Sequence, residues 1–316
     1  MIAFASNSLL CRAALRDTGI DAASFTFIRI LSGALALWII IRLRRIRFPS
    51  PQSSPKPTPS PSSFILLPEG EDGRGAPFSV REKGRDAGNW ASAFALFIYA
   101  AAFSFAYNTL PAGTGALLLF GAVQATMILW GFRKGERLDV IQIAGLIMAV
   151  AGLIVLVLPG LSAPPLIGSV LMLSAGIAWG IYSLRGKIKG PSGSDSDPIA
   201  ATAGNFLRAV PFAALVSIIM LATMHLDASG IIYAVISGAL TSGIGYVIWY
   251  AALPGLNAAS AATVQLSVPV LAATGGIFLL GESITLRYVI ASIAVLGGIF
   301  LVVIEKQRGP SGPLSK

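Results

Sequence analysis

Residues 138–158 read LDVIQIAGLIMAVAGLIVLVL, and Asp139 is the only charged residue among them. Because a helix rises 1.5 Å per residue, about 20 apolar residues are needed to cross the ~30 Å hydrocarbon core of a bilayer. Basic residues precede this stretch and Pro159 follows it, as expected at the two ends of a helix. The stretch therefore predicts a helix that spans a membrane.

The composition extends this interpretation to the whole chain of 316 residues. Hydrophobic residues make up 55% and charged residues 12%, with a mean hydropathy of +0.77, whereas a soluble domain carries about 25% charged residues. A soluble globular enzyme is therefore not expected. The single cysteine, Cys11, excludes an intramolecular disulfide, and with the single histidine, His225, it argues against a metal site or a haem. We expect neither a metal nor a cofactor.

Nine further stretches are long and apolar in the same way, which makes ten predicted spans. They cover residues 1–15, 22–43, 90–110, 112–132, 138–158, 165–184, 199–222, 230–252, 258–280 and 286–304. The alternating pattern of a membrane β-barrel is absent from the sequence, and isolated strands do not occur at bilayer depth. The predicted fold class is an all-α integral membrane protein.

Two segments near the N-terminus depart from this pattern. Residues 44–89 carry six prolines between Pro49 and Pro61, mixed with serines, and cannot bury a core, so we predict a disordered cytoplasmic insertion. A linker is favoured there over a PxxP ligand for a partner domain. The first span has only 15 residues from Met1 to Leu15, and no signal-peptide cleavage site follows it. A tilted, frayed helix and an upstream start codon both explain its length.

The basic residues are divided unevenly between the two sides of the predicted bilayer. With a cytoplasmic N-terminus, 18 of the 23 Lys and Arg residues fall on the cytoplasmic side, three on the opposite side, and Arg29 and Arg208 within spans. The positive-inside rule then predicts that both termini are cytoplasmic, including a tail of residues 305–316. The net charge of +9 follows from this topology, so we expect a lipid bilayer and not nucleic acid as the partner.

The chain contains an internal repeat. Residues 112–157 correspond to residues 258–303 without a gap, and Gly135-Glu136 falls on Gly281-Glu282. At a different offset, Phe27-Ile28-Arg29 corresponds to Phe206-Leu207-Arg208. The repeats are then residues 1–158 and 165–304, with five helices each. An odd number of helices inverts the second repeat relative to the first, an architecture that recurs in secondary transporters.

These features together resemble the drug/metabolite transporter superfamily, specifically its ten-helix proteins with two EamA-type domains. The resemblance covers nearly the whole chain except residues 44–89. It is carried by Phe-Ala-Ser-Asn at 4–7, Phe-Ile-Arg at 27–29, Tyr-Ala-Ala-Leu at 250–253, Val-Pro-Val at 268–270, the Gly-Glu turns and the glycine-rich ends of the fifth and tenth helices. The chain departs from the pattern in its short first helix, its long second loop, and Val123 at the position equivalent to Pro269. The resemblance implies a plasma-membrane carrier of small metabolites, with export favoured over import.

Arg29 and Arg208 are the only ionisable residues well inside predicted spans. A charge at that depth costs at least ~2.5–3.5 kcal/mol, so it requires compensation. One interpretation is that both arginines face a central cavity and attract an anionic group such as a carboxylate. The other, which is favoured, is that they bind helix-end carbonyls or extend to an interface.

The other substrate-binding candidates are polar and aromatic residues within spans, because the resemblance implies that these helices line a central cavity. They are Asn7, Tyr99, Phe103, Gln124, Trp179, Tyr182, Tyr246, Tyr250 and Gln265. For each aromatic residue, core packing or contact with lipid is the alternative. Glu136 and Glu282 are expected to be structural, each capping the next helix, and Pro269 is also assigned a structural role.

The predicted function is secondary transport of a small metabolite, an amino acid or a related compound, by alternating access. Because no acidic residue falls in the middle of a span, we expect uniport or exchange and not proton antiport through a carboxylate relay. The sequence has no P-loop, so ATP-driven transport is not encoded in this chain. A membrane-embedded enzyme and a non-transporting scaffold are the alternatives. The sequence carries no signal for an oligomeric state.

Overall fold

A computed structural model describes residues 1–47, 88–135, 139–158, 160, 163–187, 198–252 and 264–308, and all regular structure within these ranges is helical. This confirms the predicted all-α class. In chain order the elements are α1 (Ile2–Asp17), α2 (Ala22–Arg47), α3 (Trp90–Tyr107), α4 (Ala112–Arg133), α5 (Val140–Val157), α6 (Leu166–Lys187), α7 (Pro198–Ile219), the 3-10 turn η1 (Leu221–Thr223), α8 (Ala228–Ile236), the π-helix η2 (Ser237–Ile244), α9 (Gly245–Ala252), α11 (Ser267–Leu280) and α12 (Leu286–Arg308).

Several predicted boundaries shift. Helix α2 continues to Arg47, and most of the predicted insertion 44–89 lies outside the described residues. The predicted span 230–252 consists of α8, η2 and α9 in direct succession. The described part of the predicted span 258–280 begins at residue 264, and α12 extends past residue 304 into the predicted tail.

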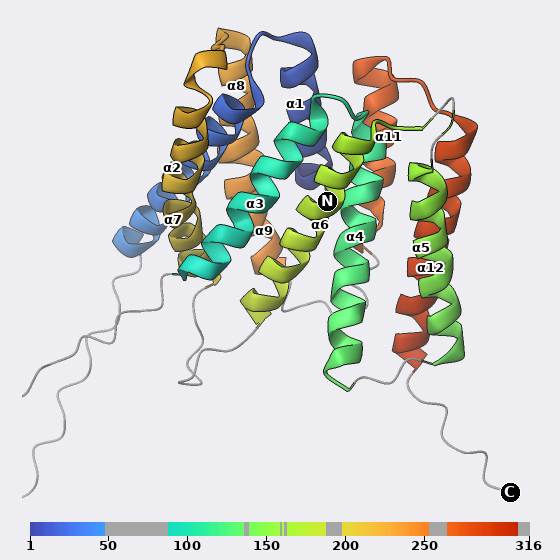
Figure 1. Ribbon diagram of the computed structural model, residues 1–316. Coiled ribbons are helices and arrows are strands. Elements are labelled where there is room, and N and C mark those ends of the chain that lie inside the picture. Colours follow the sequence, from blue (N-terminus) through green and yellow to red (C-terminus); the bar gives the residue numbers. More distant parts are fainter. Residues whose placement is uncertain are drawn as a thin grey trace, which may run out of the picture.

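Eight helical segments in the described part of the chain are long and apolar enough to cross a membrane. Helix α1 has 16 residues and α11 has 14, so both are shorter than these. Successive long elements run in opposite directions, and Figure 1 shows the α3–α4 and α11–α12 connections at the same end of the bundle. We call this the upper end, and the opposite end, where α4 finishes, the lower end.

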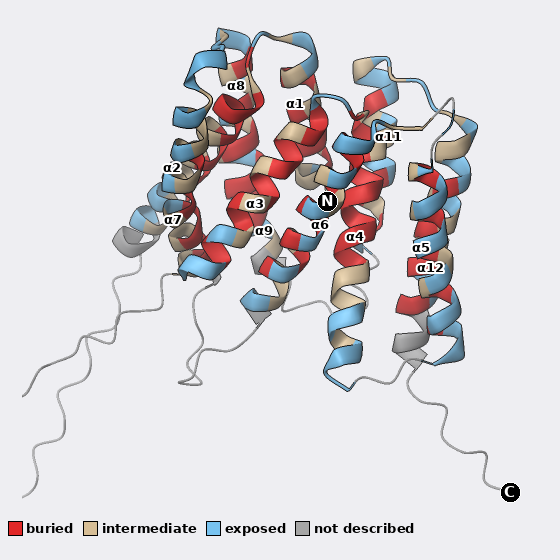
Figure 2. Ribbon diagram, in the orientation of Figure 1, coloured by how far each residue is buried: buried red, intermediate tan, exposed pale blue. Residues whose placement is uncertain are grey.

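The outward faces of the helices are exposed and apolar. Figure 2 shows buried residues gathered on the inward faces, with exposed residues along the outer faces of helices such as α5. On α5, Ile147 and Ile154 are exposed, while Ala149 and Gly152 between them are buried. An apolar surface this extensive is unfavourable in water and favourable against lipid. The fold is therefore that of an integral membrane protein.

Polar caps set the starting points of several helices. The side chains of Asp21, Asn89 and Asp227 each accept a hydrogen bond, at 2.8–2.9 Å, from the backbone N–H three residues further on. Asp139 and Gln142 form a capping box at the start of α5. These bonds satisfy backbone N–H groups that have no partner within the helix. Such a group costs free energy when it is left without a hydrogen bond near the bilayer.

The helices pack into one bundle with a pair at its side. Helix α3 packs against α6 and α7, α2 against α7, α8 and η2, and α4 against α6 and α11. Helix α1 contacts α11, α8 and η2, whereas α5 packs mainly against α12 (Figure 1). Segments far apart in sequence thus build the interior around α1, α3 and α6.

Glycines allow α5 and α12 to approach closely. A Cβ atom at Gly145 would lie 2.6 Å from the carbonyl oxygen of Gly298, and one at Gly152 would lie 2.8 Å from Cβ of Ala294. Both separations are shorter than van der Waals contact, so a side chain at either position would separate the two helices. Small residues commonly mediate helix contacts of this kind within membranes.

Candidate functional site

Arg29 of α2 lies in the interior of the bundle, with 2% of its surface exposed. Its Nη2 donates a hydrogen bond to the hydroxyl oxygen of Tyr99 at 3.1 Å. Its guanidinium carbon lies 5.4 Å from the ring centroid of Tyr99 and 4.8 Å from that of Phe103. The arginine therefore faces α3 and not lipid, and the two rings supply cation–π attraction to a desolvated charge.

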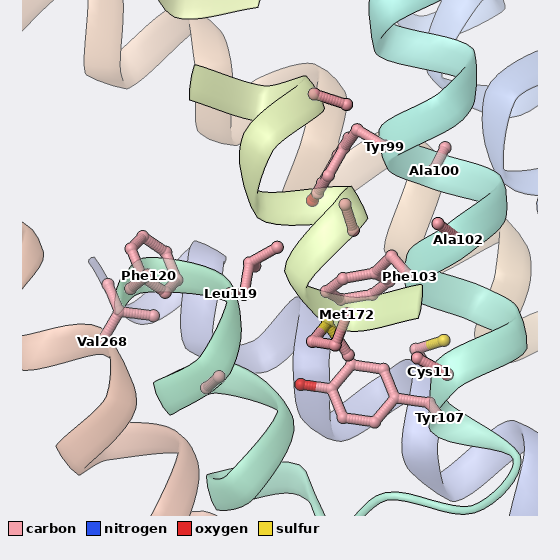
Figure 3. Packing of buried hydrophobic residues seen from close by; sticks show 14 of the residues in the cluster. Cys11, Tyr99, Ala100, Ala102, Phe103, Tyr107, Leu119, Phe120, Met172 and Val268 are labelled. Atoms are coloured by element: carbon pink, nitrogen blue, oxygen red, sulfur yellow. The ribbon is translucent and has the colours of Figure 1, made fainter. Parts of the chain in front are cut away.

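Three aromatic residues of α3 lie along one face. Figure 3 shows Tyr99, Phe103 and Tyr107 above one another, on the side of α3 that faces α6. The spacing of four residues places them on successive turns of the helix. Tyr107 is buried and donates its hydroxyl proton to the carbonyl oxygen of Ala112 at 3.2 Å, which anchors the start of α4 to α3.

Asn7 of α1 connects α3 to the π-helix η2. Its Nδ2 donates to the hydroxyl oxygen of Tyr99 at 3.4 Å, and its Oδ1 accepts from Ser237 at 2.5 Å and from Thr241 at 3.3 Å. π-helical turns within α-helices often lie at functional sites. Gly238 in the same turn allows the backbones of η2 and α2 to meet, because a Cβ atom there would overlap the carbonyl oxygen of Arg29.

An aromatic cluster continues from Tyr99 across α6 to α9 and α1. The Trp179 ring centroid lies 4.8 Å from that of Tyr99, 5.4 Å from that of Tyr182 and 5.2 Å from that of Tyr246. Phe4 lies 5.8 Å from Tyr246. Tyr182 and Tyr246 are buried, whereas Phe4 and Trp179 are half-buried. These rings form one connected apolar surface next to the Arg29 site.

The remaining candidates lie apart from these contacts or beyond what the structure describes. Gln124 is buried in α4, and Gln265 is half-buried just before α11. Arg208 is half-buried, and its Nη1 donates to the carbonyl oxygen of Gly204 in its own helix. Glu136 and the side chain of Tyr250 lie outside the described residues. Pro269 is buried in the first turn of α11, where a proline costs no helical hydrogen bond.

The Glu282 carboxylate caps a different helix from the one predicted. We expected it to cap the following helix, α12, but its Oε2 accepts from the backbone N–H of Ala112, the first residue of α4, at 2.8 Å. Its Oε1 accepts from Nε of Arg12 at 3.2 Å, and both side chains are mostly buried. The fold brings the end of α11 against the start of α4, which sequence order alone does not indicate.

Arg12 extends this connection to a fourth helix. Its Nη1 donates to the carbonyl oxygens of Tyr107 at 2.9 Å and Asn108 at 3.1 Å, at the C-terminal end of α3. We call Arg12, Glu282 and their backbone partners the upper latch. It joins α1, α3, α4 and α11 at the upper end. Beside it is an open pocket of about 270 Å³, whose polar lining includes Thr109, Thr114, Glu282, Thr285 and Tyr288.

Sequence reasoning missed Ser237, Thr241 and the role of Arg12. Hydroxyl side chains in helices usually bond their own backbone, as Thr241 also does to the Ser237 carbonyl oxygen at 2.6 Å. The only available signal was the concentration of small and hydroxyl residues in SGALTSGI at 237–244. Arg12 is one of the three basic residues that the predicted topology places on the side opposite the cytoplasm, and nothing in the sequence indicates its partners.

Comparison with known proteins gives a consistent family. The profile of the EamA-like transporter family matches residues 166–304. An uncharacterized protein of Pseudomonas aeruginosa is 50% identical over 303 residues, which cover 96% of this chain and 91% of that one. A Salmonella typhimurium protein named "Probable amino-acid metabolite efflux pump" is 26% identical, over 61% of this chain and 68% of its own.

A solved structure agrees with the fold. A crystal structure 18% identical in sequence superimposes with a TM-score of 0.58 and covers 97% of both chains.

An uncharacterized transporter of Archaeoglobus fulgidus is 26% identical, over 66% of this chain and 72% of its own. With a helical membrane fold and relatives named as transporters, the chain belongs to the EamA-like transporter family, within the drug/metabolite transporter superfamily, and is a membrane transporter.

Proposed function

We propose that this transporter is a secondary carrier that exports a small metabolite, an amino acid or a related compound, across the plasma membrane by alternating access. It is not an enzyme. In this proposal residues 1–158 and 165–304 are two inverted repeats that together provide ten transmembrane helices. Helices α1 to α5 form the first repeat. The second consists of α6, α7, the α8–η2–α9 segment, α11 and α12.

Helix packing supports the inverted repeat. If each helix is exchanged for its counterpart, the contact of α3 with α6 becomes that of α8 and η2 with α1, and the contact of α4 with α6 becomes that of α11 with α1. All of these contacts occur. The contacts α2–α7, α4–α11 and α5–α12 each join a helix to its own counterpart. A two-fold axis in the membrane plane would produce this pattern.

The equivalent glycines support the same relationship. Gly135 and Gly281 both adopt positive φ angles, 90° and 63°, each shortly after the end of a helix. Only glycine adopts this conformation at little cost, and it ends a helix sharply. The two turns therefore match in backbone conformation as well as in sequence.

The observation that carries the proposal is the position of the buried cluster between the two repeats. The first repeat contributes Asn7, Arg29 and Tyr99, and the second contributes Trp179 and Tyr246. A site at the interface of two inverted halves can open alternately to either side as the halves move. The proposed substrate-binding residues are Asn7, Arg29, Tyr99, Phe103, Trp179, Tyr182 and Tyr246, followed by Gln124, Arg208, Tyr250 and Gln265.

The distribution of charge and the upper latch support a direction of transport, from the cytoplasm outward. We propose that both termini are cytoplasmic, because most of the described basic residues belong to the lower ends of α2, α4, α6 and α12. The upper end is then external, and the upper latch joins four helices there. Half-buried Phe4, Trp179 and Trp249 belong to the lower halves of their helices. In this proposal the substrate loads from the cytoplasmic lower end, as export requires.

Transport by the purified protein in liposomes tests the proposal. Candidate substrates come from a screen for resistance to toxic metabolites in cells that overproduce the protein. We expect exchange of labelled substrate across the vesicle membrane that does not depend on a pH gradient. A variant lacking residues 50–85 is the matched control and should retain transport. The absence of exchange for every compound that confers resistance would refute the proposal. Accumulation driven by a pH gradient alone would refute the coupling mode.

A further inference from the structure

Arg29 is a buried cation, and the described residues place no carboxylate beside it. The ion pairs among the described residues are Arg12–Glu282 and Arg16–Asp17, and neither includes Arg29. The sequence places no acidic residue in the middle of a predicted span. Its described contacts in the interior are with Tyr99 and Phe103, which are neutral. An arginine within a membrane protein normally pairs with an anion or lines an aqueous path, so this charge requires a partner.

The hydrogen bonding of Arg29 is also incomplete. Its Nη2 bonds to Tyr99, but Nη1 is fully buried and has no hydrogen-bond partner among the described residues. The Tyr99 oxygen accepts from both Arg29 and Asn7, so its own proton is available to an acceptor. Two adjacent donors, Arg29 Nη1 and the Tyr99 hydroxyl, can therefore serve one oxyanion. An unsatisfied buried donor of this kind is rare and calls for an explanation.

The surface next to these donors is aromatic. Trp179 contacts Tyr99 directly, with Phe4 and Tyr246 behind it. These rings form one connected apolar surface beside the two donors. The described residues place no carboxylate there that could hold an ammonium group. The local chemistry is thus one positive charge, two donors and an apolar wall.

We infer that the Arg29 site binds a small organic monoanion, a carboxylate joined to an apolar or aromatic body. The carboxylate binds Arg29 and Tyr99, and the body packs against Trp179. This inference rests on the proposed transport function. Arginine suits this role because its planar guanidinium binds carboxylates through two N–H groups. A monoanion makes the closed site electrically neutral, whereas a zwitterion leaves it with a net positive charge in a medium of low dielectric constant.

Three ligands of nearly equal size test the charge preference. At pH 6, phenylpyruvate, phenylalanine and phenylalanine amide carry net charges of about −1, 0 and +1. The measurement is the shift of the unfolding temperature of the purified full-length protein in detergent, from which the dissociation constants follow. We expect phenylpyruvate to bind at least about tenfold more tightly than phenylalanine, and the amide to bind most weakly. Equal affinities for the three compounds, or no binding of phenylpyruvate, would overturn the inference.

Variants locate the preference at Arg29. Arg29→Gln should abolish the difference between the three ligands, and Arg29→Lys should restore part of it. Lys134→Gln removes a positive charge from the exposed lower end of α4 and should leave the preference intact. If Arg29→Gln does not fold, Tyr99→Phe supplies the test, because it removes one donor and should weaken phenylpyruvate binding selectively. A preference that survives both substitutions, or equally strong stabilisation by chloride, would refute the site.

A parallel transport assay separates this inference from the proposed function. Binding of phenylpyruvate with the expected preference, but with no exchange of any resistance-conferring compound across liposomes, would refute secondary transport and leave the anion site standing. Exchange of neutral or cationic compounds in preference to anions would support transport and refute the anion site.

Discussion

The amide of Asn7 alone connects three segments in the interior. It bonds to Tyr99, Ser237 and Thr241, and all four residues are buried. Asn7→Ala should lower the free energy of unfolding by about 1–3 kcal/mol, because it leaves the buried Ser237 hydroxyl without its described acceptor and removes one bond each from Tyr99 and Thr241. Thermal unfolding of the purified protein checks this. Ser174→Ala is the control, since that exposed hydroxyl bonds only its own helix, to Val170. Equal unfolding temperatures for Asn7→Ala and the control would contradict the role of the amide.

At this scale the sequence predicted residue types better than their partners. Arg29, Asn7 and Tyr99 could be singled out because polar groups inside apolar spans are costly. Which hydroxyl each would meet depends on the rotation and depth of packed helices, and an apolar sequence does not encode these locally. Glu282 illustrates the same limit, because its helix cap belongs to α4 and not to the following helix.

The pairing of α5 with α12 depends on glycine. Where α5 contacts α12, Gly145 lies against the backbone of Gly298. Gly145→Leu should separate the helices and destabilise the protein by about 1–3 kcal/mol or more, as overpacking does elsewhere. Gly186→Leu is the matched control, because a Cβ atom there would meet nothing within 4 Å. Thermal unfolding of both variants measures the difference. If Gly145→Leu is as stable as Gly186→Leu, the two helices do not need this contact.

Asp21 joins two loops by hydrogen bonds: the loop between α1 and α2, and the loop that leads into α8. Its Oδ2 accepts from the backbone N–H of His225 at 3.0 Å, and its Oδ1 caps α2 at Ser24. Partial burial raises its pKa, but hydrogen bonds from Ser24, His225 and Ala23 outweigh this effect and hold the pKa below the usual 3.8. A carboxyl with a lowered pKa stabilises the fold above its unfolded pKa and loses that contribution as pH falls through its folded pKa.

The consequence is a pH-dependent difference between two proteins. Asp21→Asn should unfold at a lower temperature than the wild type at pH 7, and the gap should narrow as the pH falls below about 4. Thermal unfolding in detergent from pH 7 to pH 3 measures the gap. A gap of constant size over this range would mean that the charge of Asp21 contributes nothing.

For the whole molecule, the sequence predicted an all-helical bundle of membrane spans but not the contacts that join the helix ends, and its two inverted repeats stay a prediction. Hydrophobic length and the spacing of the turns determine the number and order of spans. Closure depends on contacts between helix ends, and the upper latch draws on residues from both halves of the chain: Arg12 from the first and Glu282 from the second. Because it joins the two proposed repeats, the latch must break whenever the upper end opens.

Cys11 can report this opening, since it is the only cysteine in the sequence, precedes Arg12 and is fully buried. In lipid nanodiscs, where both faces are accessible, a water-soluble maleimide should label wild-type Cys11 slowly. Arg12→Ala or Glu282→Ala should speed labelling at least about tenfold, because loss of an ion pair with its helix caps shifts a closed–open equilibrium by about 1.4 kcal/mol or more.

Arg287→Ala is the control. Arg287 lies at the same end but donates to the Leu158 carbonyl oxygen and is not part of the upper latch, so its loss should leave the labelling rate nearly unchanged. An equal increase of the labelling rate in Arg287→Ala would show that the effect reflects a general loss of stability and not the upper latch. Unchanged labelling in both latch variants would mean that the upper end is closed by other contacts.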